Sequence, residues 1–117
     1  MILGTNKPEI IINEPTFFIL LSLASGPKHG YAVLKDTEEL SRGKVSLSTS
    51  TLYTALNRLL TQGLIERSDA GQNASGPGLP RKVYRLNERG RRILNAEAKR
   101  MQDILASYQQ RLGEEHA

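Results

Sequence analysis

Four consecutive hydroxyl side chains, Ser48 to Thr51, stand in front of a leucine-rich stretch that ends at Gly63. Ser48 suits an N-cap, because its side-chain oxygen can accept a hydrogen bond from a free N–H group of the first helical turn. Capping explains one of the four hydroxyls and at most two. A helix N-terminus also binds phosphate through its unpaired N–H groups and the macrodipole. We therefore expect Ser48, Thr49 and Ser50 to contact a polyanion, and Thr51 to face inward.

The stretch after these hydroxyls divides into two helical faces. The buried face is marked by four leucines at helical spacing: Leu52, Leu56, Leu59 and Leu60. The open face carries Thr54, Asn57 and Arg58, with Tyr53 at its boundary. In a major groove Asn can read adenine, and Arg can read guanine or bind phosphate. A solvated face is the alternative for the first three residues, and a half-buried core position is the alternative for Tyr53.

Basic residues gather later in the chain. Residues 81–100 contain eight basic and two acidic residues, whereas the whole chain has a formal net charge of +4. A local excess of this kind favours a polyanionic partner, because each neutralised phosphate releases counterions. Arg81 and Lys82 follow a loop rich in Gly and Pro, which suits contact with phosphates or a minor groove. A basic face in contact with solvent alone is the alternative.

Three arginines, Arg89, Arg91 and Arg92, begin the last predicted helix. Cations at this end of a helix oppose the macrodipole, so their presence needs a reason. A nearby phosphate backbone would supply one. Pairing with acidic residues elsewhere in a dimer would supply another, and the sequence does not separate the two.

Several classes of function are disfavoured by composition. The chain has no Cys, which excludes disulfides and thiol chemistry and fits a reducing compartment. No run of 18 apolar residues and no signal peptide is visible, so we expect a cytoplasmic protein. The two histidines, His29 and His116, lack carboxylates at ligand spacing, so we expect no metal and no cofactor. No catalytic set or phosphate-cradling loop is present, and we expect no enzyme activity.

The elements that must position these residues form a mainly α chain with a small β-hairpin. Pro15 begins an apolar helix, and a second helix has Tyr31, Leu34 and Leu40 on its apolar stripe beside Val33 and Thr37. This second helix is expected at 28–41. It is followed by a strand at 44–48, a third helix at 48–62, hairpin strands at 64–68 and 81–87, and a last helix at 88–112. This order is that of a winged helix-turn-helix.

The last predicted helix carries a heptad seam: Leu94, Ala98, Met101, Leu105, Tyr108 and Leu112. The seam is too short for an independent coiled coil and needs a partner, for which a second subunit is favoured over the same chain. We therefore divide the chain into an N-terminal arm at 1–13, a DNA-binding domain at 14–87, and a dimerisation helix with a frayed tail at 88–117. Whether Glu9–Ile12 forms a strand or an arm stays open.

Three ordered blocks resemble the PadR-type transcriptional regulators: "HGYAVLKD" from His29, "LSTSTLYTALNRLLTQGLI" from Leu47, and "GLPRKVYRLNERGRRIL" from Gly78. The resemblance covers roughly residues 15–112. It implies a winged helix with a C-terminal dimerisation helix, of the subgroup in which that helix is short. It also implies a homodimer that binds specific sequences of double-stranded DNA, usually as a repressor relieved by a small molecule or a stress signal.

The resemblance extends to a possible effector and has two departures. In the family the dimer interface can hold a flat aromatic molecule, whose wall here would be Met101, Leu105 and Tyr108. The family pattern usually has Gly where Ser50 stands and often Pro where Thr54 stands. Both positions lie on the surface expected to face DNA, so no operator sequence carries over. The rival interpretations are a winged helix that docks protein, and a ligand sensor with weak DNA binding.

Overall fold

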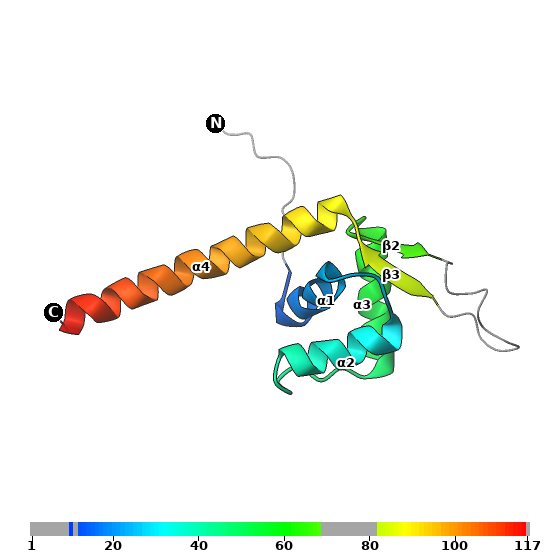
Figure 1. The fold of residues 1–117 in the computed structure, drawn as a ribbon, viewed down its shortest axis with the longest axis horizontal. Helices are drawn as coiled ribbons and strands as arrows, with labels where there is room; N and C mark the ends of the chain where they lie inside the picture. The colour runs from blue at the N-terminus through cyan, green and yellow to red at the C-terminus, as the bar shows by residue number, and fades with distance from the viewer. Residues whose placement is uncertain (1–9, 11, 69–81, 117) are drawn as a thin grey trace, which may run out of the picture.

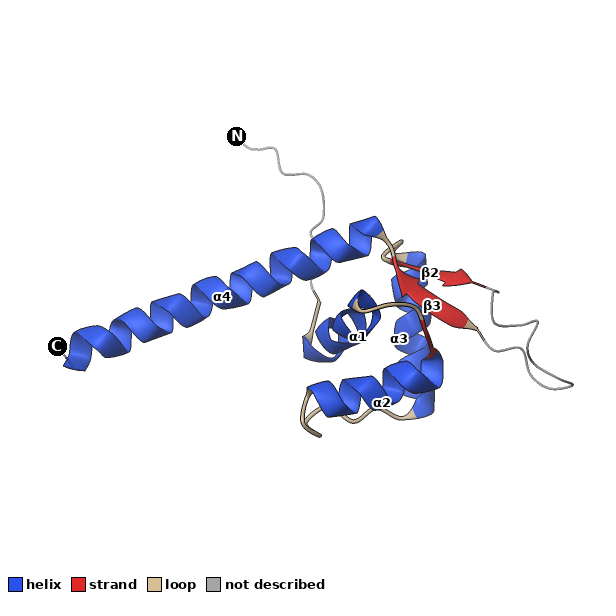
Figure 2. Ribbon diagram, viewed as in Figure 1, coloured by secondary structure: helices blue, strands red, loops and turns tan. Residues whose placement is uncertain are grey.

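The computed structural model describes residues 10, 12–68 and 82–116, the last three of these by their backbone alone. The elements follow the order of a winged helix, with a short strand between the first two helices (Figures 1 and 2). They are α1 (Glu14–Ala24), β1 (Lys28–His29), α2 (Gly30–Leu40), α3 (Thr49–Thr61), β2 (Ile65–Ser68), β3 (Val83–Leu86) and α4 (Glu88–His116). No helix in these ranges is long and apolar enough to cross a bilayer.

Side-chain caps fix where three of the helices begin. Asn13 accepts a hydrogen bond from the Thr16 amide at 2.9 Å, and Pro15 occupies the first turn of α1, as the sequence predicts. Ser48 accepts from the Thr51 amide at 3.1 Å and caps α3. Asn87 does the same for α4, because its Oδ1 lies 2.8 Å from the Gly90 amide nitrogen. Each cap satisfies an amide that the helix itself leaves unpaired.

The sheet has the order β1-β3-β2, with both pairs antiparallel. The predicted hairpin is confirmed as β2 and β3. The predicted strand at 44–48 is wrong, because the Val45 amide donates to the Ser41 hydroxyl at 2.9 Å and not to a neighbouring strand. The third strand is instead β1, which the sequence analysis assigned to the second helix. Lys28 pairs with Tyr84 there, and its ammonium group donates to the Ser22 carbonyl at 2.6 Å.

A single apolar cluster joins α1, α3, the sheet and the start of α4. Its fully buried members include Ile19, Leu20 and Leu23 from α1 and Leu52, Leu56 and Leu59 from α3. The predicted buried face of α3 is thus confirmed. On α2 the predicted stripe holds for Val33 and Thr37, which are buried, and for Leu34, which packs partly buried against the cluster. It fails for Tyr31 and Leu40, which are 67% and 42% exposed. Ile12 and Ile10 of the predicted arm pack against the same cluster.

Helix α4 leaves this cluster and extends away from the domain (Figure 1). The radius of gyration is 17.6 Å, whereas a compact chain of this length has about 13 Å. The first turns of α4 lie along α1, and Leu94 is buried in the core cluster with an exposed fraction of 5%. Leu94 therefore belongs to the protomer's own core, which corrects its assignment to the dimer seam. From Lys99 to Gly113 every described side chain is exposed.

Gly90 permits the close approach of α4 to the end of α3. A Cβ on Gly90 would overlap the Leu64 carbonyl oxygen and would lie 2.7 Å from Cδ1 of Leu86. The backbone oxygen cannot rotate away. The absence of a side chain at Gly90 therefore sets the distance between the two elements.

Gly90→Ala tests this contact. Alanine is normally the better helix former by about 0.5–1 kcal/mol, but overpacking typically costs about 1–3 kcal/mol. We expect a net loss of about 1–2 kcal/mol in the free energy of unfolding, measured by urea denaturation. Gly113→Ala, on the same helix with nothing within 4 Å of the added Cβ, is the matched control and should cause no loss. Equal effects of the two substitutions would contradict the contact.

Candidate nucleic-acid interface

The first turn of α3 presents an exposed group of hydroxyls. The Ser48 hydroxyl is 2.9 Å from Thr51 Oγ1 and 3.3 Å from Ser50 Oγ. Thr51 is exposed, so the expectation that it faces inward is wrong: its hydroxyl lies outside and joins the cap. Capping thus occupies Ser48 and Thr51. Thr49 and Ser50 are left as exposed hydroxyls beside the unpaired amides of the helix N-terminus.

The open face of α3 is polar along its length. Thr54, Asn57 and Arg58 are all exposed, on the side opposite the buried leucines. Among the described residues, neither Asn57 nor Arg58 has a side-chain hydrogen-bond or ion-pair partner. Their donor groups are therefore available to an external partner. We use "recognition face" for the exposed set Thr49, Ser50, Tyr53, Thr54, Asn57 and Arg58.

Tyr53 joins three elements at the edge of the recognition face. Its ring centroid is 6.5 Å from that of Tyr84 on β3, and its phenol stands directly over Gly30 at the start of α2. A Cβ on Gly30 would overlap the phenol oxygen and lie 2.7 Å from Cζ. Tyr53 remains 38% exposed, whereas Tyr84 is buried, and this burial raises the pKa of the Tyr84 phenol. Tyr53 thus has both a packing role and a free edge.

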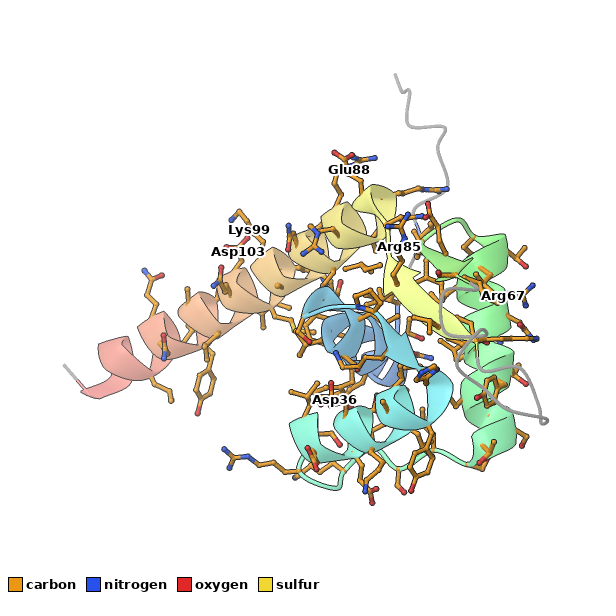
Figure 3. The ribbon with its side chains drawn as sticks, turned by 45° about the vertical axis from the view of Figure 1, so that its right-hand side comes forward. Asp36, Arg67, Arg85, Glu88, Lys99 and Asp103 are labelled. Atoms are coloured by element: carbon orange, nitrogen blue, oxygen red, sulfur yellow. The ribbon has the colours of Figure 1, made fainter. Side chains whose placement is uncertain are left out.

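Arg67 is a candidate that the sequence analysis missed. Strand β2 alternates, and Ile65 and Arg67 share the face of the sheet turned toward the core and α3, with Arg67 opposite Tyr84 in the register. Arg67 is exposed, makes no ion pair with a described residue, and points out of the molecule in Figure 3. The period-two pattern of the predicted strand, counted from Ile65, would have identified it.

The basic residues on and directly before β3 have different positions. Lys82 is exposed just before β3, and Arg81 lies outside the described residues. Arg85 lies on the opposite face of the sheet from Tyr84, where its guanidinium is 2.7 Å from the Glu66 carboxylate (Figure 3). Arg85 is therefore paired within the chain and faces away from α3.

Two of the three arginines at the start of α4 have partners within the chain. Arg89 donates to the Gln62 carbonyl at 2.9 Å, at the end of α3. Arg92 pairs with Glu88 one turn earlier at 3.4 Å. The sequence analysis left two explanations open, a nearby phosphate backbone or acidic residues elsewhere in a dimer. Neither of these two contacts is of that kind. Arg91 is exposed without an ion-pair partner among the described residues.

The seam of α4 remains uncovered in the protomer. Its exposed apolar members beyond Leu94 are Met101, Leu105, Tyr108 and Leu112, with exposed fractions of 36–59%, and Ala98 is half-buried. Ile104 is exposed beside them. Lys99 and Asp103 form an ion pair at 3.1 Å on the side of α4 turned away from α1 (Figure 3). The exposed part of α4, residues 99–113, is thus amphipathic.

The described residues contain no cluster of three His, Cys, Asp or Glu side chains able to hold a metal ion. His29 lies in β1, where its Nδ1 is buried without a hydrogen-bond partner among the described residues. It precedes α2 but makes no capping hydrogen bond with its side chain.

Comparison with known proteins identifies the class of this fold. Residues 19–96 match the transcriptional regulator PadR-like family, and the chain belongs to that family. The match runs from the second half of α1 to the first turns of α4 and includes the recognition face. A search of curated proteins finds no match.

Solved structures agree with this assignment. A PadR family transcription regulator from Clostridium difficile R20291 is 25% identical with a TM-score of 0.69, over 86% of this chain and 99% of that chain. A PadR family regulator from Eggerthella lenta is 28% identical with a TM-score of 0.56, over 85% and 83%. Bacillus subtilis PadR, solved in complex with operator DNA, is 25% identical with a TM-score of 0.62, over 71% of this chain and 45% of that chain.

The contact between Tyr53 and Gly30 can be tested by a double-mutant cycle. We expect Gly30→Ala to lower the free energy of unfolding by about 1 kcal/mol, because the added methyl group displaces the Tyr53 ring. In a Tyr53→Ala background the same substitution should cost much less, because the ring is gone. Urea denaturation of the four proteins gives the coupling energy. An equal cost in both backgrounds would show that Gly30 acts through something other than Tyr53.

Proposed function

We propose that this protein is a homodimeric transcriptional regulator that binds double-stranded DNA, with α3 of each protomer in a major groove. The observation that carries the proposal is the recognition face, which lies opposite the buried leucines of α3 and on which the Asn57 and Arg58 side chains have no described hydrogen-bond or ion-pair partner. Asn57 and Arg58 have the donor groups that read base edges, and Thr49 and Ser50 adjoin free amides suited to phosphate. The operator complex of Bacillus subtilis PadR supports this use of the fold.

Basic residues flank the recognition face on its sheet side. Arg67 and Lys82 are exposed, and Arg81 adjoins Lys82 in the sequence. Such residues contact phosphates and hold the protein in register, without reading the sequence. A winged helix that docks protein would be expected to carry an acidic or apolar third helix. The hydroxyl, amide and guanidinium groups on α3 favour DNA over that alternative.

The dimer is supported by the uncovered seam of α4. Leu105, Ile104 and Tyr108 are each more than half exposed on one long helix. Apolar residues repeated at heptad spacing are stabilised when a second helix covers them. Two protomers joined there would present two recognition faces, with half-sites about one helical turn of DNA apart. In such a dimer Met101, Leu105 and Tyr108 would line any site for a flat aromatic effector.

The regulatory outcome that we propose is repression, relieved by a small molecule or a stress signal. A dimeric repressor occupies its operator until an effector changes the geometry of the two recognition helices. The alternative, a ligand sensor with weak DNA binding, would bind aromatic molecules and would leave duplex mobility unchanged.

Two substitutions should separate sequence reading from backbone contact on a duplex selected from a randomised library. Asn57→Ala should cost about 1–3 kcal/mol at one base pair and change the preference among sequences. Lys82→Ala should weaken all sequences alike and lower the salt slope of the logarithm of the binding constant by about 1. Lys99→Ala removes a lysine that is paired with Asp103 on α4, and serves as the control. The proposal fails if the wild-type protein shows no salt-dependent binding to duplex DNA.

The dimer seam has its own test. Leu105→Glu places a charge among the exposed apolar residues and should yield monomers by light scattering, because burying an unpaired carboxylate is strongly unfavourable. Gln110→Glu makes the same acid on the opposite side of the helix and should leave the dimer intact. A Leu105→Glu protein that remains dimeric would remove the seam from the interface.

A further inference from the structure

The end of α3 and the start of α4 are joined by a dense set of hydrogen bonds. The Asn87 amide group donates through Nδ2 to the Gly63 carbonyl at 2.8 Å, and its backbone N–H donates to the Leu64 carbonyl at 3.2 Å. Arg89 donates to the Gln62 carbonyl at 2.9 Å. Three successive carbonyls directly after α3, those of residues 62–64, thus accept hydrogen bonds from residues at the start of α4. We call residues 62–64 with 87–90 the α3–α4 joint.

Asn87 has two roles in the joint at once. Its Oδ1 accepts a hydrogen bond from the Gly90 amide at 2.8 Å, which caps α4. Its Nδ2 donates to the carbonyl of Gly63, which lies in the turn directly after α3. One planar amide group therefore fixes the direction of the first turn of α4 relative to the last turn of α3. A capping Asp or Ser would keep the first contact, but an ionised Asp could not donate the second.

A long lever amplifies the geometry of this joint. Helix α4 has 29 residues, so its length is about 43 Å at 1.5 Å per residue. A tilt of about 10° at the joint would move the far end of such a helix by about 7 Å. Leu94 holds α4 to the core about one turn after the joint, and beyond Ala98 the described side chains are exposed. The direction of the seam is therefore set near the joint.

We propose that Asn87 is a positioning residue for DNA recognition, whose bridge to Gly63 sets the angle between α3 and α4 and thereby the spacing of the two half-sites. The proposal rests on the proposed function, because the seam must join two protomers for the angle to become a spacing. The distance between the two recognition faces of the dimer is then determined by the joint in each protomer. Asn87 touches no DNA in this arrangement and acts through the orientation of α3.

The test variant is Asn87→Asp, which keeps a good N-cap and loses the donor to Gly63. Asn95→Asp is the matched control, with the same change of side chain and charge at an exposed position on the same helix. Both proteins are compared with the wild type on duplexes that carry two copies of the selected half-site at varied separations. We expect the wild type and Asn95→Asp to prefer one separation. For Asn87→Asp we expect the ratio of best to neighbouring affinities to fall at least fivefold, or the optimum to move.

A second measurement needs no DNA. The chain has no Cys, so Ala32→Cys on α2 and Gln110→Cys on α4, both exposed, give a unique pair of spin labels. Dilution with unlabelled protein leaves at most one labelled protomer in each assembly. The distance distribution should be narrow in the wild type and Asn95→Asp, and shifted or broadened in Asn87→Asp. If circular dichroism shows that Asn87→Asp is poorly folded, Arg89→Ala takes its place. The distance distribution of Arg89→Ala should then be shifted or broadened relative to the wild type.

The outcomes separate the two proposals. An unchanged distance distribution in Asn87→Asp, or in Arg89→Ala where that variant stands in, overturns the role of the joint whatever the DNA result. A uniform loss of affinity with an unchanged spacing optimum also overturns it, because that pattern reports stability alone. If the distances change but the wild type binds no duplex, the joint is upheld as the determinant of the angle, its role in half-site spacing is overturned, and the proposed function fails.

Discussion

The burial of one leucine face of α3 is the constraint on which the rest of the structure depends. Leu52, Leu56 and Leu59 are each at most 2% exposed, in a cluster shared with α1 and the sheet. Full burial of such a side chain contributes about 1.5–3 kcal/mol, so rotating α3 about its axis would lose several kcal/mol. The rotation of α3 is thereby fixed. Since the recognition face lies opposite these leucines, every contact proposed between α3 and DNA is oriented by apolar packing.

Much of this arrangement could be predicted because its signals are local and periodic. The leucines of α3 and the two hairpin strands follow from spacing, and the cap at Ser48 follows from its residue type. Strand β1 could not, since two residues have no period and their pairing depends on β3, more than 50 positions away. The residues 44–48 alternate like a strand, yet the Ser41 hydroxyl takes the amide that a partner strand would need. A hydrogen bond to a side chain thus takes the place of pairing with a neighbouring strand. The alternation of apolar and polar residues does not distinguish these two cases.

The heptad pattern of α4 illustrates a different limit. Leu94 and Leu105 belong to the same heptad repeat, but Leu94 is 5% exposed in the protomer and Leu105 is 52% exposed. A hydrophobic repeat indicates that a face is covered without indicating by which chain. Here the face continues from the protomer's own core onto the uncovered part of α4. A second subunit bound to the seam would therefore extend the apolar layer against which α1 packs. The dimer interface and the core of the protomer would then form one continuous apolar surface.

The joint also resolves the puzzle of the basic residues that begin α4. Arg89 opposes the macrodipole of its own helix, which is unfavourable when that helix is considered alone. The structure places it instead at the C-terminus of α3, where the partial charge is negative and the Gln62 carbonyl accepts a hydrogen bond from the Arg89 guanidinium at 2.9 Å. The relevant field is therefore that of the neighbouring helix. The carbonyls of residues 62–64, directly after α3, accept hydrogen bonds from Asn87 and Arg89 at the start of α4. These polar backbone groups are thereby paired where the two segments meet.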